Sequence, residues 1–309
     1  MAWSLQDAPR LDGKTAIVTG ATGGLGWETA LGLAQQGATT ILAGRNPVKG
    51  ADALARLTVR APGTTARFEL LDLASLDSVA MFAARIAAAH PAVSVLVNNA
   101  GVMAPPARRV TADGFELQFG TNYLGHFALT ARLLPPLLAS GAARVVSVSS
   151  MAHRRARMDF GDPQAARSYK PWAAYGQSKL AMLMFARELQ RRATASGWPL
   201  RSVAAHPGWA VTGLIGNGPG AGAPGLKEAL MEGAFRVLGQ SAARGALPIL
   251  YAALAPEAEA GGYYGPNGFM EIKGEVGPSQ VMPQAADTGA AMRLWTLSEQ
   301  ETGVQFGPG

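Results

Sequence analysis

Short runs of apolar, often β-branched residues alternate with longer Ala- and Leu-rich stretches from Thr15 to about His206. The short runs predict six strands, at residues 15–19, 39–43, 67–71, 93–97, 144–148 and 201–205. The stretches between them predict helices at 27–36, from Asn46-Pro47 onward, and at 76–89, 114–140 and 172–195. Strands that are apolar throughout and separated by helices form a parallel sheet covered on both faces. The pattern therefore predicts an α/β fold with a doubly wound parallel sheet, of the Rossmann type.

The pattern changes after His206. Residues 213–225 are rich in Gly and Pro, which predicts a mobile loop of the kind that often covers an active site. A helix is expected at 242–255 and a last strand at Phe269–Ile272. The last four residues, Phe306–Gly309, are expected to fray.

Composition narrows the function classes. With 48% hydrophobic and 16% charged residues, the chain can bury a large core, and the absence of Cys excludes disulfides, thiolate metal sites and a cysteine nucleophile. The four His residues show no paired ligand spacing, so no metal is expected. The net charge of +6 includes a basic cluster at His153–Arg157, but no nucleic-acid-binding motif accompanies it, and we expect solvated surface charge. Without a signal peptide or a long apolar run, we expect a cytoplasmic protein with no membrane span.

A glycine-rich turn directly follows the first predicted strand. Glycines at 20, 24 and 26 leave room for a pyrophosphate, and the following helix would offer free N–H groups and a partial positive charge. A tight turn with no ligand is the simpler interpretation, but the flanking strand and helix favour dinucleotide binding. The expected cofactor contacts here are Gly20, Thr22, Gly23, Gly24, Leu25 and Gly26.

The second predicted strand leads into Arg45 and Asn46. The adenosine ribose of a dinucleotide lies at this strand end, where a carboxylate would select NAD. Arg45 can instead pair with a 2′-phosphate through two hydrogen bonds, so we expect NADP (NADPH), with NAD less favoured. An exposed Arg beside a helix cap is the alternative. Asn46 is expected to cap the next helix and to lie beside the cofactor.

Three further strand ends carry candidate cofactor contacts. Asp72 can meet the adenine amino group, although it can equally well start a helix. Asn98 is expected to tie the sheet to the glycine turn, and the small residues after it let the chain pass close to the cofactor. Backbone groups and a Thr hydroxyl after the sixth strand can hold the carboxamide or phosphates. The candidates are Asp72, Leu73, Asn99, Ala100, Gly101, Pro207, Gly208 and Thr212.

Tyr175 and Lys179 lie four residues apart at the start of a predicted helix, so both face the same side. A free tyrosine has a pKa of about 10, and a neighbouring ammonium favours its phenolate. Ser150 ends the fifth strand at the same sheet edge and can hold a substrate oxygen, or else serve as a helix cap, with Ser149 bonding to backbone. Asn122, inside a predicted helix, can hold a water beside Lys179, or simply be a satisfied core amide.

Taken together, these residues resemble the short-chain dehydrogenase/reductase superfamily in its TGxxxGxG form. The order and spacing match from about Gly13 to Leu214, roughly two-thirds of the chain. Three stretches, Ala43–Asn46, Asn122–Phe127 and Tyr175–Ala181, look closest to the retinol-dehydrogenase-like branch. The superfamily set comprises Thr19-Gly20, Gly24, Gly26, Asn98-Asn99-Ala100-Gly101, Asn122, Ser150, Tyr175, Lys179 and Pro207-Gly208.

The resemblance implies a role for each catalytic residue. Tyr175 would be the acid/base, Ser150 would polarise the substrate oxygen, Lys179 would bind the nicotinamide ribose and lower the tyrosine pKa, and Asn122 would support a water-linked proton relay. NADP-preferring members often carry a basic residue within the glycine turn, whereas residues 21–23 hold none, so Arg45 would bear that preference alone. The segment after Leu214 matches no substrate-specific pattern of the superfamily, so the resemblance implies no particular substrate.

The sequence thus predicts an NADP(H)-dependent oxidoreductase that interconverts a carbonyl and an alcohol. The apolar, glycine-rich region Leu214–Leu238 suggests that the substrate is a hydrophobic small molecule. We expect one domain over residues 1–309, with a cofactor-binding and catalytic core at about 13–212 and a substrate loop and C-terminal elements at about 213–309. The sequence does not decide between a monomer and a homo-oligomer, and no nucleic-acid partner is expected. Two alternatives are a C=C (enoyl-type) reductase on the same fold and a non-catalytic NADP(H)-binding protein.

Overall fold

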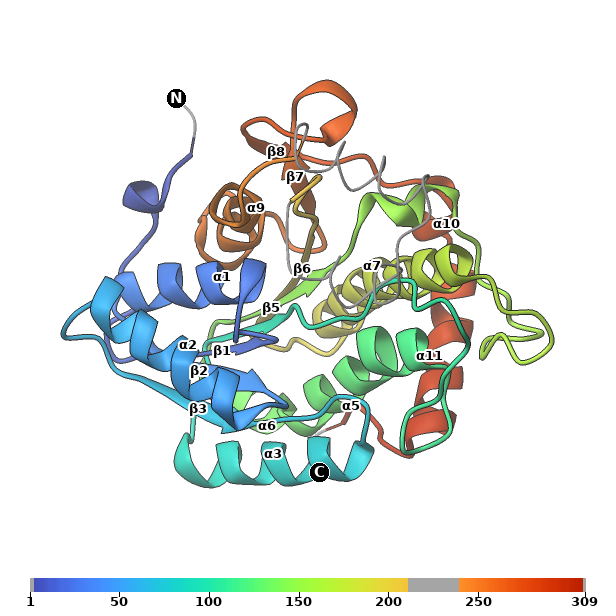
Figure 1. Ribbon diagram of the computed structural model, residues 1–309, viewed down its shortest axis with the longest axis horizontal. Coiled ribbons are helices and arrows are strands. Elements are labelled where there is room, and N and C mark those ends of the chain that lie inside the picture. Colours follow the sequence, from blue (N-terminus) through green and yellow to red (C-terminus); the bar gives the residue numbers. More distant parts are fainter. Residues whose placement is uncertain (1–2, 211–238, 308–309) are drawn as a thin grey trace.

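The computed structural model describes residues 3–210 and 239–307 of the chain, built around an eight-stranded sheet (Figure 1). The strand order is β3-β2-β1-β4-β5-β6-β7-β8. Strands β1 to β7 pair in parallel and β8 pairs antiparallel to β7. The strands are β1 Thr15–Thr19, β2 Thr39–Gly44, β3 Ala66–Leu70, β4 Val95–Asn98, β5 Ala143–Val148, β6 Leu200–Ala205, β7 Tyr263–Pro266 and β8 Val276–Pro278.

The helices form two layers, one on each face of the sheet (Figure 1). On one face lie α1 (Gly24–Gln35), α2 (Pro47–Arg60) and α9 (Ala242–Leu254). The other face is covered by α3 (Leu76–Ala89), α5 (Gly125–Arg132), α6 (Leu134–Ala139), α7 (Pro171–Ala195) and α11 (Thr288–Thr302), and the short helix α10 (Pro283–Ala286) packs against α7. Both faces of the central strands are therefore buried, which explains why these strands are apolar throughout.

All six predicted strands are present, and their ends differ from the predicted ones by at most two residues. The doubly wound parallel sheet is confirmed. Because β1 lies between β2 and β4, the direction of winding reverses beside it. In such sheets, ligands bind in the crevice at the carboxyl ends of the strands at this reversal, where the glycine turn follows β1.

The predicted helix over 114–140 is wrong as a single element. The structure places a short helix, α4 (Leu117–Phe119), before a π-helical turn at Gly120–Leu124, and then α5 and α6. A β-carbon at Gly120 would press against the Thr111 side chain, so the chain packs closely here. Pro residues in the first turn of α6 start a new helix after Leu133, because proline fits a first turn but not a helix interior.

The predicted last strand at Phe269–Ile272 is also wrong. Residues Phe269–Glu271 form a single 3-10 turn, in which Met270 and Glu271 have φ angles of 52° and 58°. Positive φ is unusual for residues with side chains and does not fit a strand. The two additional strands, β7 and β8, flank this turn on either side.

Of the four C-terminal residues expected to fray, the structure describes Phe306 and Gly307, and Phe306 is packed. The Phe306 ring contacts the rings of Trp295 and Phe127, with centroids 4.5 and 5.1 Å apart. Trp295 lies on α11, a helix that the sequence pattern did not reveal, and it stacks on Phe185 of α7. Phe306 therefore packs against α7, and residues 308 and 309 lie outside the described part. In that described part, no helix combines the length and the apolar character needed to cross a membrane.

Candidate active site

The glycine turn after β1 has the shape of a phosphate cradle. Gly20 has a φ of 66°, and a β-carbon there would lie 2.9 Å from Ala100 Cα. A β-carbon at Gly26 would overlap the Gly20 carbonyl, whereas one at Gly23 would meet no atom within 4 Å. Gly23 caps α1 and offers no side chain to its first N–H groups. Open space in front of an uncapped helix N-terminus fits the pyrophosphate of a dinucleotide.

Asn99, rather than Asn98, ties the sheet to this turn. The Asn99 side-chain amide donates to the Thr19 carbonyl at 2.8 Å, and the backbone N–H groups of Asn99 and Ala100 donate to the Thr19 hydroxyl at 2.9 and 3.0 Å. Asn98 instead donates to Thr130 of α5 at 2.9 Å. The expectation for Asn98 is therefore corrected: it points into the helical layer, because successive residues of a strand face opposite sides of the sheet.

Arg45 directly follows β2 and is exposed. A β-carbon at the preceding residue, Gly44, would lie 3.0 Å from the Thr22 side chain, so the end of β2 adjoins the glycine turn. Asn46 caps α2 by accepting a hydrogen bond from the Lys49 N–H at 3.0 Å, as expected. The structure thus brings Thr22 and the residues around Arg45 together.

Asp72 and Leu73 follow β3. One Asp72 oxygen accepts from the Ala74 N–H at 3.0 Å, which closes a local turn. The cap of α3 is Ser75, so Asp72 does not start that helix. Leu73 is buried, and its carbonyl packs where a β-carbon on Gly125 would stand. Asp72 as an adenine contact stays a prediction.

Tyr175 and Ser150 meet at the carboxyl edge of the sheet. Tyr175 lies in the second turn of α7 and is 7% exposed, and Ser150 follows β5. Burial raises the pKa of Tyr175, and a hydrogen bond with the Ser150 side chain opposes that rise. The Ser150 hydroxyl also accepts from the Ala152 N–H at 3.2 Å, so it caps the next turn as well. The two candidate catalytic hydroxyls therefore lie on the same side of the sheet edge, and the Ser150 hydroxyl influences the titration of Tyr175.

Lys179 lies one helical turn beyond Tyr175 and is also buried, at 5% exposure. Its amine donates to the Val148 carbonyl at 3.0 Å and lies 6.0 Å from the centre of the Tyr175 ring. Burial lowers the pKa of Lys179 to about 8. The Ser149 hydroxyl donates to the Lys179 carbonyl at 2.7 Å, which matches the backbone-bonding role expected for Ser149.

Asn122 lies within the π-helical turn and is fully buried. Its side chain accepts from the Val102 N–H at 2.7 Å and donates to the Val102 carbonyl at 3.0 Å and to Ser178 at 2.9 Å. A β-carbon on Gly101 would lie 3.1 Å from the Asn122 oxygen and 3.5 Å from the Lys179 amine. Asn122 and Lys179 therefore approach the same glycine, while the Asn122 amide itself braces the loop after β4 against α7.

His126 is a buried link that sequence reasoning missed. Its Nδ1 lies 2.9 Å from the Asn122 carbonyl, which can only accept, so Nδ1 carries the proton. Its Nε2 then accepts from the Thr19 hydroxyl at 2.9 Å. Burial lowers the pKa of His126 to about 3. A neutral imidazole thus joins the residue before the glycine turn to the backbone of Asn122, and the only sequence signal was its place in the Asn122–Phe127 motif.

The segment after β6 is held by a second polar cluster. Gly208 has a φ of 63°, and its N–H donates to His206 Nδ1 at 3.2 Å. The other His206 nitrogen bonds to Glu271 at 2.8 Å, and Glu271 pairs with Arg154 at 2.7 Å. These partners lower the pKa of Glu271 to about 2, although burial opposes the shift. Pro207 and Gly208 are therefore fixed beside the sheet edge, whereas Thr212 and the loop at 213–225 lie outside the described residues.

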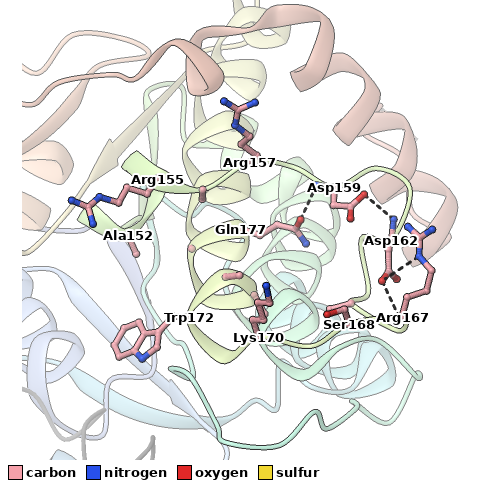
Figure 2. Close-up of a pocket in the computed structure, with 15 residues that line it drawn as sticks. Ala152, Arg155, Arg157, Asp159, Asp162, Arg167, Ser168, Lys170, Trp172 and Gln177 are labelled. Carbon is pink, nitrogen blue, oxygen red and sulfur yellow. Dashed lines mark hydrogen bonds and ion pairs between the residues drawn. The ribbon is translucent and has the colours of Figure 1, made fainter. Parts of the chain in front are cut away.

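A cavity of about 720 Å³ opens beside the first turn of α7 (Figure 2). Trp172 lines it and also packs edge-on against the Tyr175 ring, with centroids 6.0 Å apart. Arg155, Arg157 and Lys170 border the cavity, and Figure 2 shows Asp162 and Arg167 paired on the side opposite Trp172. The cavity therefore adjoins Tyr175 across the Trp172 ring.

The comparisons with known proteins agree with this geometry. The family model for short chain dehydrogenases matches residues 14–217. Mouse retinol dehydrogenase 13 is 40% identical over 302 residues, covering 97% of this chain and 86% of that protein. Mouse polyprenol dehydrogenase is 40% identical over 308 residues, covering 97% and 87%.

Among solved structures, an uncharacterised protein from Mycobacterium paratuberculosis superposes with a TM-score of 0.82 at 39% identity, and the match covers all of both chains. Three findings support the same family assignment: a family model that spans most of the chain, relatives at this identity and a matching fold. The chain belongs to the short-chain dehydrogenase family of nicotinamide-dependent oxidoreductases, in its retinol-dehydrogenase-like branch.

Proposed function

We propose that this protein is an NADP(H)-dependent oxidoreductase that interconverts a carbonyl and an alcohol, with Tyr175 as its acid/base. The observation that carries the proposal is the grouping of three residues: Tyr175 in the second turn of α7, Ser150 just after β5, and the Lys179 amine 6.0 Å from the centre of the Tyr175 ring. All three lie at the sheet edge where ligands of this fold bind. The arrangement supplies a proton donor and a hydrogen-bond donor to one substrate oxygen.

When bound, the nicotinamide supplies or accepts the hydride. The glycine turn and the N-terminus of α1 would hold the pyrophosphate of the dinucleotide. Tyr175 gives the substrate oxygen its proton in reduction or removes it in oxidation. Ser150 donates to the same oxygen and stabilises the charge that develops there. With a pKa of about 8, Lys179 is mostly protonated at neutral pH, and its positive charge favours the phenolate form of Tyr175.

NADP rather than NAD is proposed on the strength of Arg45. This side chain is exposed directly after β2, and the neighbouring Asn46 is occupied as a helix cap. No carboxylate therefore stands at the two positions after β2 to repel a 2′-phosphate, and a guanidinium can bind it. A cofactor-bound structure would test the remaining proposed cofactor contacts, which are Thr22, Leu25, Asp72, Asn99, Ala100, Gly101, Pro207, Gly208 and Thr212.

The substrate is proposed to be a hydrophobic ketone, aldehyde or alcohol. The similarity to enzymes named for retinol and polyprenol supports this class. The Leu214–Leu238 segment, which suggested a hydrophobic substrate from sequence, lies outside the described residues. The division into a core at about 13–212 and a substrate region at about 213–309 stays a prediction.

The test is NADPH oxidation across a panel of aliphatic, aromatic, retinoid-like and steroid-like carbonyls, with wild type and Tyr175→Phe. We expect Tyr175→Phe to abolish turnover while NADPH binding, measured by fluorescence, stays within about twofold. Tyr251→Phe, on α9, is the matched control and should keep full activity. Turnover retained by Tyr175→Phe would contradict the acid/base assignment.

An α,β-unsaturated ketone in the panel separates the alternatives. An allylic alcohol as product supports carbonyl reduction, whereas a saturated ketone identifies a C=C reductase. NADPH binding without turnover on any compound, in both directions, would indicate a non-catalytic binding protein.

A further inference from the structure

The fold brings a second cation to the glycine turn from a helix that sequence reasoning did not connect with the cofactor. Arg56 lies in the last third of α2, 34 residues after Thr22 of the turn. Its Nη2 donates to the Thr22 carbonyl at 3.2 Å. The turn itself contains no basic residue. A positive charge is therefore present at the turn even though none is encoded within it.

Arg56 and the residue before Arg45 approach one residue, Thr22, from two different elements. A β-carbon on Gly44, the residue before Arg45, would lie 3.0 Å from the Thr22 side chain, while Arg56 bonds to the Thr22 carbonyl. We propose that Arg56 is a second specificity-determining residue, which binds the 2′-phosphate of NADP together with Arg45. This inference rests on the proposed preference for NADP.

Three contacts hold the guanidinium of Arg56 in place, with Thr22, Trp27 and Asp52. Its central carbon lies 4.7 Å from the centre of the Trp27 ring, and its Nε donates to Asp52 at 3.0 Å. The side chain is 45% exposed, and its Nη1 makes no hydrogen bond within the described residues. A fixed guanidinium with free N–H donors loses little freedom when it binds a phosphate.

The effect of Asp52 on 2′-phosphate binding distinguishes a binding role of Arg56 from a purely structural one. Its carboxylate offsets the charge of Arg56 and repels a nearby phosphate. Removing that charge should therefore strengthen 2′-phosphate binding, although it also removes a contact that orients Arg56. If Arg56 only braced the turn, losing the contact would weaken binding of every adenine ligand.

The experiment compares the binding of adenosine 2′,5′-bisphosphate and 5′-AMP to the full-length protein by calorimetry. We expect Arg56→Gln to weaken binding of the bisphosphate about tenfold and that of 5′-AMP less than twofold. Arg56→Lys, which keeps the charge but not the forked donors, should be intermediate. Asp52→Asn should strengthen bisphosphate binding, and Arg60→Gln, an exposed Arg one turn further along α2, should change neither ligand.

The kinetic readout is the ratio of kcat/KM for NADPH to that for NADH, which should fall about tenfold in Arg56→Gln. Equal weakening of both ligands in the Arg56 variants, or weaker bisphosphate binding in Asp52→Asn, would overturn the inference. Wild type and Arg45→Asp together distinguish a failure of the proposed NADP preference from a failure of the proposed role of Arg56. If wild type binds both ligands equally, the proposed NADP preference fails; if Arg45→Asp removes a preference that Arg56→Gln leaves intact, only the role of Arg56 fails.

Discussion

At the scale of single residues, the site combines two ionisable groups whose charged forms are both disfavoured by burial. Burial raises the pKa of Tyr175 and lowers that of Lys179 to about 8. Without cofactor, the phenol therefore stays protonated at neutral pH. Reduction of a carbonyl needs this protonated form, whereas oxidation of an alcohol needs the phenolate.

The two directions should therefore depend on pH with opposite signs. We expect kcat/KM for alcohol oxidation to rise with pH and kcat/KM for carbonyl reduction to fall as Tyr175 loses its proton. Lys179→Met removes the ammonium that favours the phenolate, so the inflection in the plot of kcat/KM against pH should move to higher pH in this variant. Steady-state rates from pH 6 to 10 measure this, and an inflection unchanged in Lys179→Met would show that the amine does not tune the tyrosine.

At the scale of elements, α5 and the π-helical turn are coupled to β1 through His126. The folded state keeps His126 neutral down to about pH 3, whereas an unfolded chain protonates it below about 6.5. Between these values the unfolded state binds one more proton, so the free energy of unfolding falls as the pH falls. For one such proton the fall is about 1.4 kcal/mol per pH unit.

Replacing His126 by Gln should therefore flatten the dependence of stability on pH. The variant is expected to be less stable at pH 7, because the hydrogen bonds to Asn122 and Thr19 are altered. Urea unfolding between pH 7 and 5 gives the slope, which should drop in His126→Gln but persist in part, because burial also lowers the pKa of His153 and His206. Parallel wild-type and variant curves would contradict the buried neutral state.

At the scale of the whole molecule, the C-terminal segment supports the helix that carries Tyr175. Trp295 of α11 is 1% exposed and packs against Phe185 of α7 and against Phe306, with Arg192 4.2 Å from its ring. Tyr175 and Lys179 lie near the other end of α7. Support for the back of α7 therefore comes from residues more than a hundred positions further along the chain.

Trp295→Ala should destabilise the protein by about 3–5 kcal/mol, because it leaves a large cavity among aromatic rings. At temperatures where the variant is folded, KM for NADPH should stay close to wild type, since Trp295 packs on the face of the sheet opposite to α1 and the glycine turn. Met292→Ala, at an exposed position of the same helix, is the control and should change stability by no more than about 0.5 kcal/mol. Thermal unfolding measures both; a small loss in Trp295→Ala would mean that the aromatic cluster contributes little.

The sequence by itself determined the features that depend on neighbours in the chain. Alternating apolar runs predicted the parallel sheet, because a strand buried on both faces must be apolar throughout. The glycine turn after Thr15–Thr19 and the i, i+4 pair of Tyr175 and Lys179 are local patterns, and residue types at fixed spacing were enough to identify them as the candidate site.

Only the tertiary structure decided what depends on contacts between distant residues. It divided the predicted 114–140 helix, turned Met270 and Glu271 away from a strand, and used Asn99 instead of Asn98 to hold the turn. It also brought His126 to Thr19 and Arg56 to Thr22. The spacing of these pairs along the chain carries no periodic signal, because the distance between such residues is set by the packing of helices and strands around a shared core.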